Sequence, residues 1–219
     1  TVYSETATVR VFAQRKQLQR WNSETEEMEK SVMANDTNGD LKDSIGGFNL
    51  GRPAGYIQDF ESLPEETKQL IRSVKLVSVI YGTVTMKNPI NNEGTTVADI
   101  EDVPFVMDIK NNDSKKSING VMNHLKKKKL LPIMSTIELE GITGTVASGA
   151  KFGKISAKLG TPCDISGTDN DTLKDFIELI EYNNGRILDL HHERAKADTD
   201  GDTELVEAIL NNDFVEVDE

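Results

Sequence analysis

Positively charged and aromatic side chains lie close together along several segments of this chain, and that combination suits nucleic acids. Lysine and arginine bind phosphate oxygens, while exposed aromatic rings stack on bases, each stack contributing on the order of 1–3 kcal/mol. The densest cationic segment is NHLKKKKLLP, which holds Lys126, Lys127, Lys128 and Lys129 in succession. These residues predict a surface that contacts a single strand.

The other candidate contacts fall in four segments, each of which mixes cations with aromatic rings. They are Arg10, Arg15, Arg20 and Trp21; Phe48, Arg52 and Tyr56 in a Gly-rich loop; Lys75 and Tyr81; and Lys151, Phe152, Lys154 and Lys158. Alternatives stay open for four of these segments. The lysine run could complement a helix dipole, Trp21 could be buried rather than exposed, Tyr81 shares a strand face with Val77 and Val79 and could be core, and the Gly-rich loop could be an ordinary packed loop.

Motifs for catalysis and metal binding are weak in this chain. No phosphate-binding loop or nucleophile elbow is present, and the pair His191–His192 lacks a third ligand at helical spacing. The segment 196–207 aligns with an EF-hand loop, but it has Lys196 at the first ligand position, where calcium needs a carboxylate. A shorter, similar segment at 35–40 has Ala34 at that position. Tight turns are therefore predicted for both segments. We expect no enzyme, no cofactor and no metal.

Negative charge is concentrated at the C-terminal end. Residues 197–219 hold nine of the 37 acids and none of the 25 bases, which leaves 28 acids against 25 bases in residues 1–196. Such blocks often serve as interaction tails, and apolar residues interrupt this one. We therefore expect one domain over 1–196, with a long polar surface excursion at about 33–62, followed by an acidic tail over 197–219.

The elements that must position these side chains are mostly strands. The patterns predict strands over 7–13, 74–86, 103–110, 132–146 and 151–160, with 16–22 as the return arm of an N-terminal hairpin. They also predict a helix over 64–73 behind a capping box at Ser62, an amphipathic helix from Asp113 or Ser114 to Pro132, and a helix over 171–195 that Asn183–Gly185 could interrupt. The expected class is mainly β with helices.

A helix between the third and fourth of five strands is the layout of the OB-fold, a small Greek-key barrel. With that order over 74–165 and the tail DTDGDTELVEAILNNDFVEVDE, the chain resembles the bacteriophage-type single-stranded DNA-binding proteins. The resemblance implies a five-stranded barrel with an added C-terminal helix, binding of single-stranded DNA without sequence specificity in replication or recombination, and a tail that recruits replication proteins or competes with DNA. This tail departs from the family pattern by ending in VEVDE rather than an aromatic residue.

The alternative function is a non-enzymatic viral structural or adaptor protein, or a host-directed inhibitor. The chain has no apolar run long enough to span a bilayer and only one cysteine, Cys163, so we expect a cytoplasmic location, in the host if the protein is viral. The oligomeric state stays open, with a homodimer among the candidates.

Overall fold

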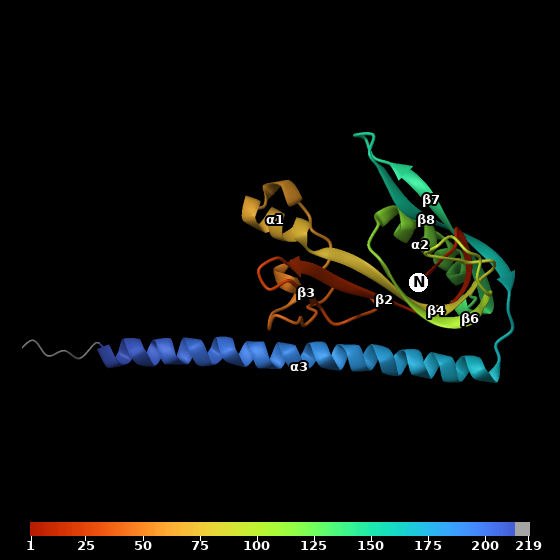
Figure 1. The fold of residues 1–219 in the computed structure, drawn as a ribbon. Helices are drawn as coiled ribbons and strands as arrows, with labels where there is room; N and C mark the ends of the chain where they lie inside the picture. Colours follow the sequence, from red (N-terminus) through yellow and green to blue (C-terminus); the bar gives the residue numbers. More distant parts are fainter. Residues whose placement is uncertain (213–219) are drawn as a thin grey trace, which may run out of the picture. The chain divides into compact units, whose positions relative to one another are not determined.

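The computed structural model describes the backbone of residues 1–212 and the side chains of residues 1–196. Among these residues the fold is mixed α and β, with an antiparallel six-stranded sheet and three α-helices (Figure 1), which confirms the expected α+β class. The chain divides into two compact units. The sheet unit is Thr1–Lys16 with Leu76–Ile180, and the loop unit is Gln17–Lys75 with Glu181–Glu219.

The elements follow one another as mostly long strands, short helices and one long helix. They are β1 (Val2–Tyr3), β2 (Thr6–Asn22), β3 (Glu27–Lys30), α1 (Glu65–Ser73), β4 (Lys75–Met86), β5 (Ile90–Asn91), β6 (Ile100–Ile109), α2 (Asn112–Lys127), β7 (Ser135–Thr145), β8 (Lys151–Pro162) and α3 (Gly167–Asn212). The expected capping box is wrong, because Pro64 precedes α1 and the Ser62 hydroxyl donates instead to the carbonyl of Asp59.

The main sheet has the strand order β6-β4-β2-β7-β8, with β3 pairing β2 outside this path. Three strands, β2, β4 and β6, follow one another across the sheet, and the connection through α2 then brings β7 back beside β2. This is a Greek-key arrangement. A separate pair, β1 with β5, is also antiparallel.

The N-terminal hairpin is wrong, because 7–13 and 16–22 belong to one continuous strand, β2. The residues between them, Gln14 and Arg15, offer no glycine, proline or asparagine for a tight turn. The chain turns only after Asn22, where Glu26 has a φ of 54° and β3 returns along β2 with Trp21 opposite Met28.

Gly82 lets β4 approach β2 closely. A Cβ at this position would collide with the backbone carbonyl oxygen of Arg10, so only glycine fits. The irregularity in the β4–β6 pairing lies further along, between Val84 and Met86. Gly82 thus sets the distance between two central strands.

The core of the sheet unit lies between the strands and α2. Side chains from four strands and from α2 form one buried cluster, namely Val9, Val11, Ile80, Ile109, Ile118, Val121, Leu125 and Ile137. The amphipathic helix predicted here is therefore confirmed, with Ile118, Val121 and Leu125 on its buried face. Its start differs from the prediction, because the Asn111 side chain caps the helix by accepting hydrogen bonds from the backbone N–H groups of Asp113 (2.8 Å) and Ser114 (3.1 Å).

Helix α2 also covers the outer edge of β8. The Ser114 hydroxyl oxygen accepts a hydrogen bond from the Ile155 N–H (2.9 Å), and the Ser117 hydroxyl oxygen accepts one from the Ala157 N–H (2.8 Å). Because these edge groups bond to α2, they are not available to β6. The described strands accordingly form an open sheet, with β6 and β8 at its two ends.

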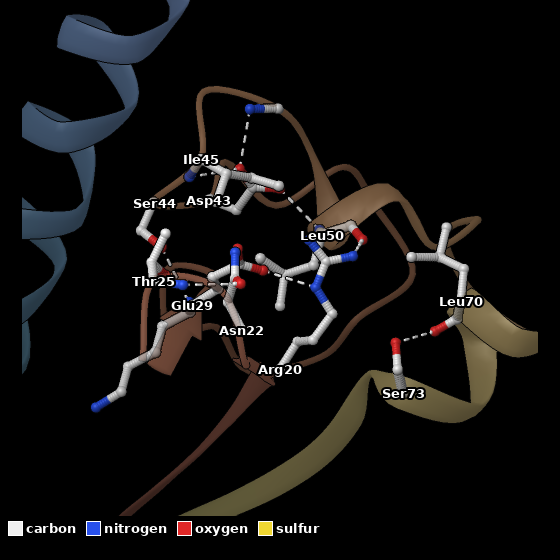
Figure 2. A network of polar contacts seen from close by, with 12 residues as sticks. Arg20, Asn22, Thr25, Glu29, Asp43, Ser44, Ile45, Leu50, Leu70 and Ser73 are labelled. Carbon is white, nitrogen blue, oxygen red and sulfur yellow. Dashed lines mark hydrogen bonds and ion pairs between the residues drawn. The ribbon is translucent and has the colours of Figure 1, made fainter. Parts of the chain in front are cut away.

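The predicted polar excursion at 33–62 lies largely at the surface of the loop unit but has a buried centre. Leu50 and Asn49 are buried, and so is Asp43, whose carboxylate accepts hydrogen bonds from the backbone N–H groups of Ile45 (3.2 Å), Gly47 (2.9 Å) and Leu50 (2.7 Å). Figure 2 shows this carboxylate inside the loop. A buried carboxylate bonded to backbone N–H groups orders the segment without regular secondary structure.

Helix α3 continues through Asn183–Gly185, where the sequence allowed an interruption. Asn184 instead pairs with the backbone of Met33, accepting from its N–H (2.7 Å) and donating to its carbonyl (3.0 Å). His191, expected near a helix end, lies buried within the helix with Nδ1 3.3 Å from the carbonyl oxygen of Asp43. None of the described helices is long and apolar enough to cross a membrane.

Candidate nucleic-acid interface

The lysine run closes α2 through a Schellman motif. The Leu130 N–H donates to the Leu125 carbonyl and the Lys129 N–H to the Lys126 carbonyl, both at 3.0 Å. Lys129 takes the left-handed conformation at the C′ position, with a φ of 57°, where glycine is the usual residue. The helix thus ends with Lys129 in a backbone conformation that is unfavourable for lysine.

A groove lies beside this helix end in the sheet unit, and we call it the lysine groove. It has a volume of about 460 Å³ and is lined by Gln14, Met122, Asn123, Lys126, Lys129, Leu130, Leu131 and Pro132. Two cations and two amides border apolar side chains, and Leu131 is 58 % exposed. No carboxylate belongs to the lining, so the groove suits an anion that also carries apolar surface.

The four lysines lie at the C-terminal end of α2, where cations complement the helix dipole, as the sequence allowed. Within the described side chains, none of Lys126–Lys129 has a carboxylate within ion-pair distance. The strand lysines differ, because Lys154 lies 3.4 Å from Asp113 and Lys158 lies 3.9 Å from Glu140. Of the β8 candidates, Lys151 is exposed and the Phe152 ring lies over Gly144 on β7. The helix end is therefore better placed than β8 to attract phosphate.

Two of the three predicted arginines on β2 are committed to carboxylates. Arg10 donates through both terminal nitrogens to Asp169, each at 3.0 Å, and Arg20 donates to Glu29 at 2.6 Å (Figure 2 shows the second pair). The hydrogen bond from Arg10 holds the pKa of Asp169 below its ordinary value, and the same bond raises the pKa of Arg10. Arg15 is half-buried, and among the described residues its guanidinium donates only to the carbonyl of Gln14 (3.0 Å).

Tyr81 is in the core, so the structure does not place its ring where a base could stack. It is 1 % exposed, its ring centroid lies 5.8 Å from that of Phe176, and burial raises its pKa. The shared face with Val77 and Val79 is a buried face, because helix α3 covers it with Phe176. The alternative that the sequence left open for Tyr81 is the observed one.

The exposed aromatic candidates all belong to the loop unit. Trp21 is 57 % exposed, Phe48 is 49 % exposed and packs edge-on against His191, and Tyr56 is 89 % exposed. Arg52 is half-buried with an Nε that has no hydrogen-bond partner among the described residues. Lys75 is exposed and donates to the carbonyl of Arg72.

A second cleft of about 430 Å³ lies on the sheet, and its chemistry is mixed. It is lined by Thr6, Ala7, Thr8, Thr85, Lys87, Glu138, Leu139, Glu140, Ser156 and Lys158. The two glutamates offset the two lysines, so this cleft is less suited to a phosphate chain than the lysine groove.

The described residues contain no group of three or more potential metal ligands. The segment 35–40 forms the expected turn, with the Asp36 carboxylate accepting from the Asn38 N–H at 3.0 Å. Apart from Lys196, the calcium alignment at 196–207 and the acidic tail at 197–219 fall on residues whose side chains lie outside the described part of the chain.

Sequence reasoning missed Gln14 as a member of the lysine groove. Asn123 and Leu131 are near the lysines in the sequence, so they could have been predicted to lie beside them. Gln14 lies on β2, more than a hundred residues away along the chain. Only the packing of β2 against α2 brings it there.

Comparison with family models, with curated proteins and with solved structures finds no match to this chain.

Proposed function

We propose that this protein is a non-enzymatic single-stranded DNA-binding protein that coats the strand during phage-type replication or recombination. The observation that carries the proposal is the lysine groove: in a chain of net charge -12, Lys126 and Lys129 line a groove without carboxylates, and none of Lys126–Lys129 has an ion-pair partner among the described side chains. Flexible phosphodiester chains bind such grooves, with affinity that falls as salt rises.

The strand order supports an OB-like fold as the scaffold. The order β6-β4-β2-β7-β8 with α2 between β6 and β7 corresponds to a five-stranded Greek-key barrel that stays open between its third and fifth strands. OB-folds are often only partly closed, and they bind oligonucleotides. The open side is accounted for by Ser114 and Ser117, which bond the edge of β8.

Exposed aromatic rings supply the second requirement. Trp21 and Tyr56 in the loop unit present surface to which bases can stack. The acidic tail over 197–219 is proposed to compete with DNA for lysines or to recruit replication proteins. That role follows from its charge and its interspersed apolar residues.

Binding of a fluorescent 20-nucleotide oligo(dT) at several salt concentrations tests the proposal. The double variant Lys126→Ala/Lys129→Ala should bind more weakly, and the slope of log affinity against log salt should fall by roughly 0.7 for each phosphate that the variant no longer neutralises. Lys110→Ala/Lys116→Ala is the matched control, because it removes two exposed lysines outside the groove. It should bind nearly as tightly as the unchanged protein.

A full-length variant with Asp213→Asn, Glu216→Gln, Asp218→Asn and Glu219→Gln tests the tail. Tighter binding than the unchanged protein is expected if the tail competes with DNA. If neither form binds oligo(dT) even at low salt, DNA binding is ruled out, and the alternative of a structural or adaptor protein takes its place.

A further inference from the structure

We infer that Gln14 gives the lysine groove a modest preference for bases that carry an exocyclic amino group. The inference rests on the proposed function and deepens it, because it assigns one side chain to a base and the lysines to the phosphates. Gln14 is the β2 residue in the lining, opposite the lysine-bearing end of α2.

The amide nitrogen of Gln14 is fully used inside the protein. Its Nε2 donates to the Ser78 hydroxyl oxygen at 2.7 Å and to the Asn119 Oδ1 at 3.1 Å. An amide NH₂ group has two hydrogens, so both are committed. Ser78 is buried on β4, whereas Asn119 is an exposed residue of α2, so the Gln14 amide is bonded to two separate elements, one of them in the core.

The Oε1 of Gln14 is therefore what this side chain offers to a ligand. This oxygen accepts no hydrogen bond from any described residue. A carbonyl oxygen can only accept, so the fixed amide recognises donors. Asn123, the other amide in the lining, makes no hydrogen bond through its side chain among the described residues and can rotate, so it accepts either kind of partner and does not discriminate.

Exocyclic amino groups are the donors that project from the edges of bases. Cytosine carries one at N4, adenine at N6 and guanine at N2, whereas thymine and uracil place a carbonyl at the position of the cytosine amine. The remaining donor of thymine, N3–H, lies between two carbonyl oxygens, which repel an approaching acceptor. A base held near Lys126 and Lys129 by its phosphates should thus bind more tightly when it is amino-bearing.

The test compares two 12-nucleotide strands that differ in one group. One strand is oligo(dC), and the other carries 2-pyrimidinone, which is cytosine without its amino group. Because a neutral hydrogen bond contributes about 0.5–1.5 kcal/mol, the full-length protein should bind oligo(dC) about 3- to 10-fold more tightly. In Gln14→Met, which keeps the length of the side chain, the two affinities should become equal.

Two controls separate the possible failures. Lys126→Ala should weaken both strands by the same factor and leave the preference intact, because it removes a cation that faces phosphate. If the full-length protein binds both strands equally, or if Gln14→Met keeps the preference, the inference is wrong while DNA binding stands. If neither strand binds at low salt, the proposed function itself fails. Should Gln14→Met not fold, the comparison of the two strands with the unchanged protein still decides.

Discussion

Arg10 and Asp169 form a two-point ion pair that ties β2 to the first turn of α3, with each terminal arginine nitrogen 3.0 Å from a carboxylate oxygen. The pair is largely screened from water, and Arg10 also donates to the carbonyl of Ile133. Removing one partner would leave the other charge half-buried. We therefore expect Asp169→Asn to lower the free energy of unfolding by about 2 kcal/mol, measured by urea denaturation.

The control for this change is Asp171→Asn. Asp171 is exposed on the same helix and lies 3.8 Å from Lys174, a surface pair. Surface pairs contribute little, so Asp171→Asn should change stability by less than about 0.5 kcal/mol. Equal losses in the two variants would contradict the role assigned to Asp169.

The same ion pair predicts a pH dependence. The pKa of Asp169 is lowered in the folded state by the hydrogen bond from Arg10, so its contribution is fully present above the unfolded pKa of about 3.9 and is lost as pH falls toward the folded value. The difference in Tm between the unchanged protein and Asp169→Asn should be constant from pH 7 to 5. It should shrink progressively as pH falls below about 4, and a difference at pH 3 as large as that at pH 7 would argue against a charge effect.

Lys129→Gly should separate stability from binding. The left-handed φ of 57° costs lysine about 1 kcal/mol, so glycine should raise the free energy of unfolding by about that amount. It should also weaken oligo(dT) binding, because the groove then carries one cation fewer. Lys128→Gly is the comparison: Lys128 has a φ of -82°, so glycine there should not stabilise. A Lys129→Gly protein no more stable than the original would contradict the strain.

Gly82→Ala and Gly120→Ala should have opposite effects. An added Cβ at Gly82 meets the Arg10 carbonyl, and moving the backbone should cost about 3 kcal/mol. Gly120 lies in α2 with nothing within 4 Å of an added Cβ, so alanine should stabilise by about 1 kcal/mol through its helix propensity. Thermal unfolding of both variants checks this. A Gly82→Ala protein as stable as the original would contradict the close approach of β4 to β2.

Trp21 provides an optical signal for binding. Because it is the only tryptophan and is 57 % exposed, iodide should quench its fluorescence strongly in the free protein. If bases stack on Trp21, saturating oligo(dT) should lower the Trp21 emission. The emission that remains should then be protected from quenching by iodide. Unchanged emission with a bound strand would remove Trp21 from the interface while leaving the lysine groove unaffected.

Local patterns predict those elements whose burial follows from their own residues. The spacing of Ile118, Val121 and Leu125 predicts the buried face of α2, because a helix repeats every 3.6 residues. The position of Phe176 and Ile180 on one face of α3 follows in the same way. The α+β class rests on the sum of such segments.

Partners distant in sequence decide several outcomes that local patterns do not predict. Arg10 and Tyr81 look available in the sequence, but Asp169 and Phe176 from α3 cover them. The N-terminal hairpin is wrong because Gln14 and Arg15, which lack the residue types of a tight turn, continue β2. Gln14 lines the groove only through packing of β2 against α2, which no local pattern contains.

Both ends of the open sheet are protected from strand-to-strand association. At one end the hydroxyls of Ser114 and Ser117 occupy the N–H groups of β8, and at the other Pro104 interrupts the row of donors on β6. Exposed edges are the usual starting points of aggregation, and covering helices and prolines prevent it. The sheet can therefore remain open at high local protein concentration without polymerising through its edges.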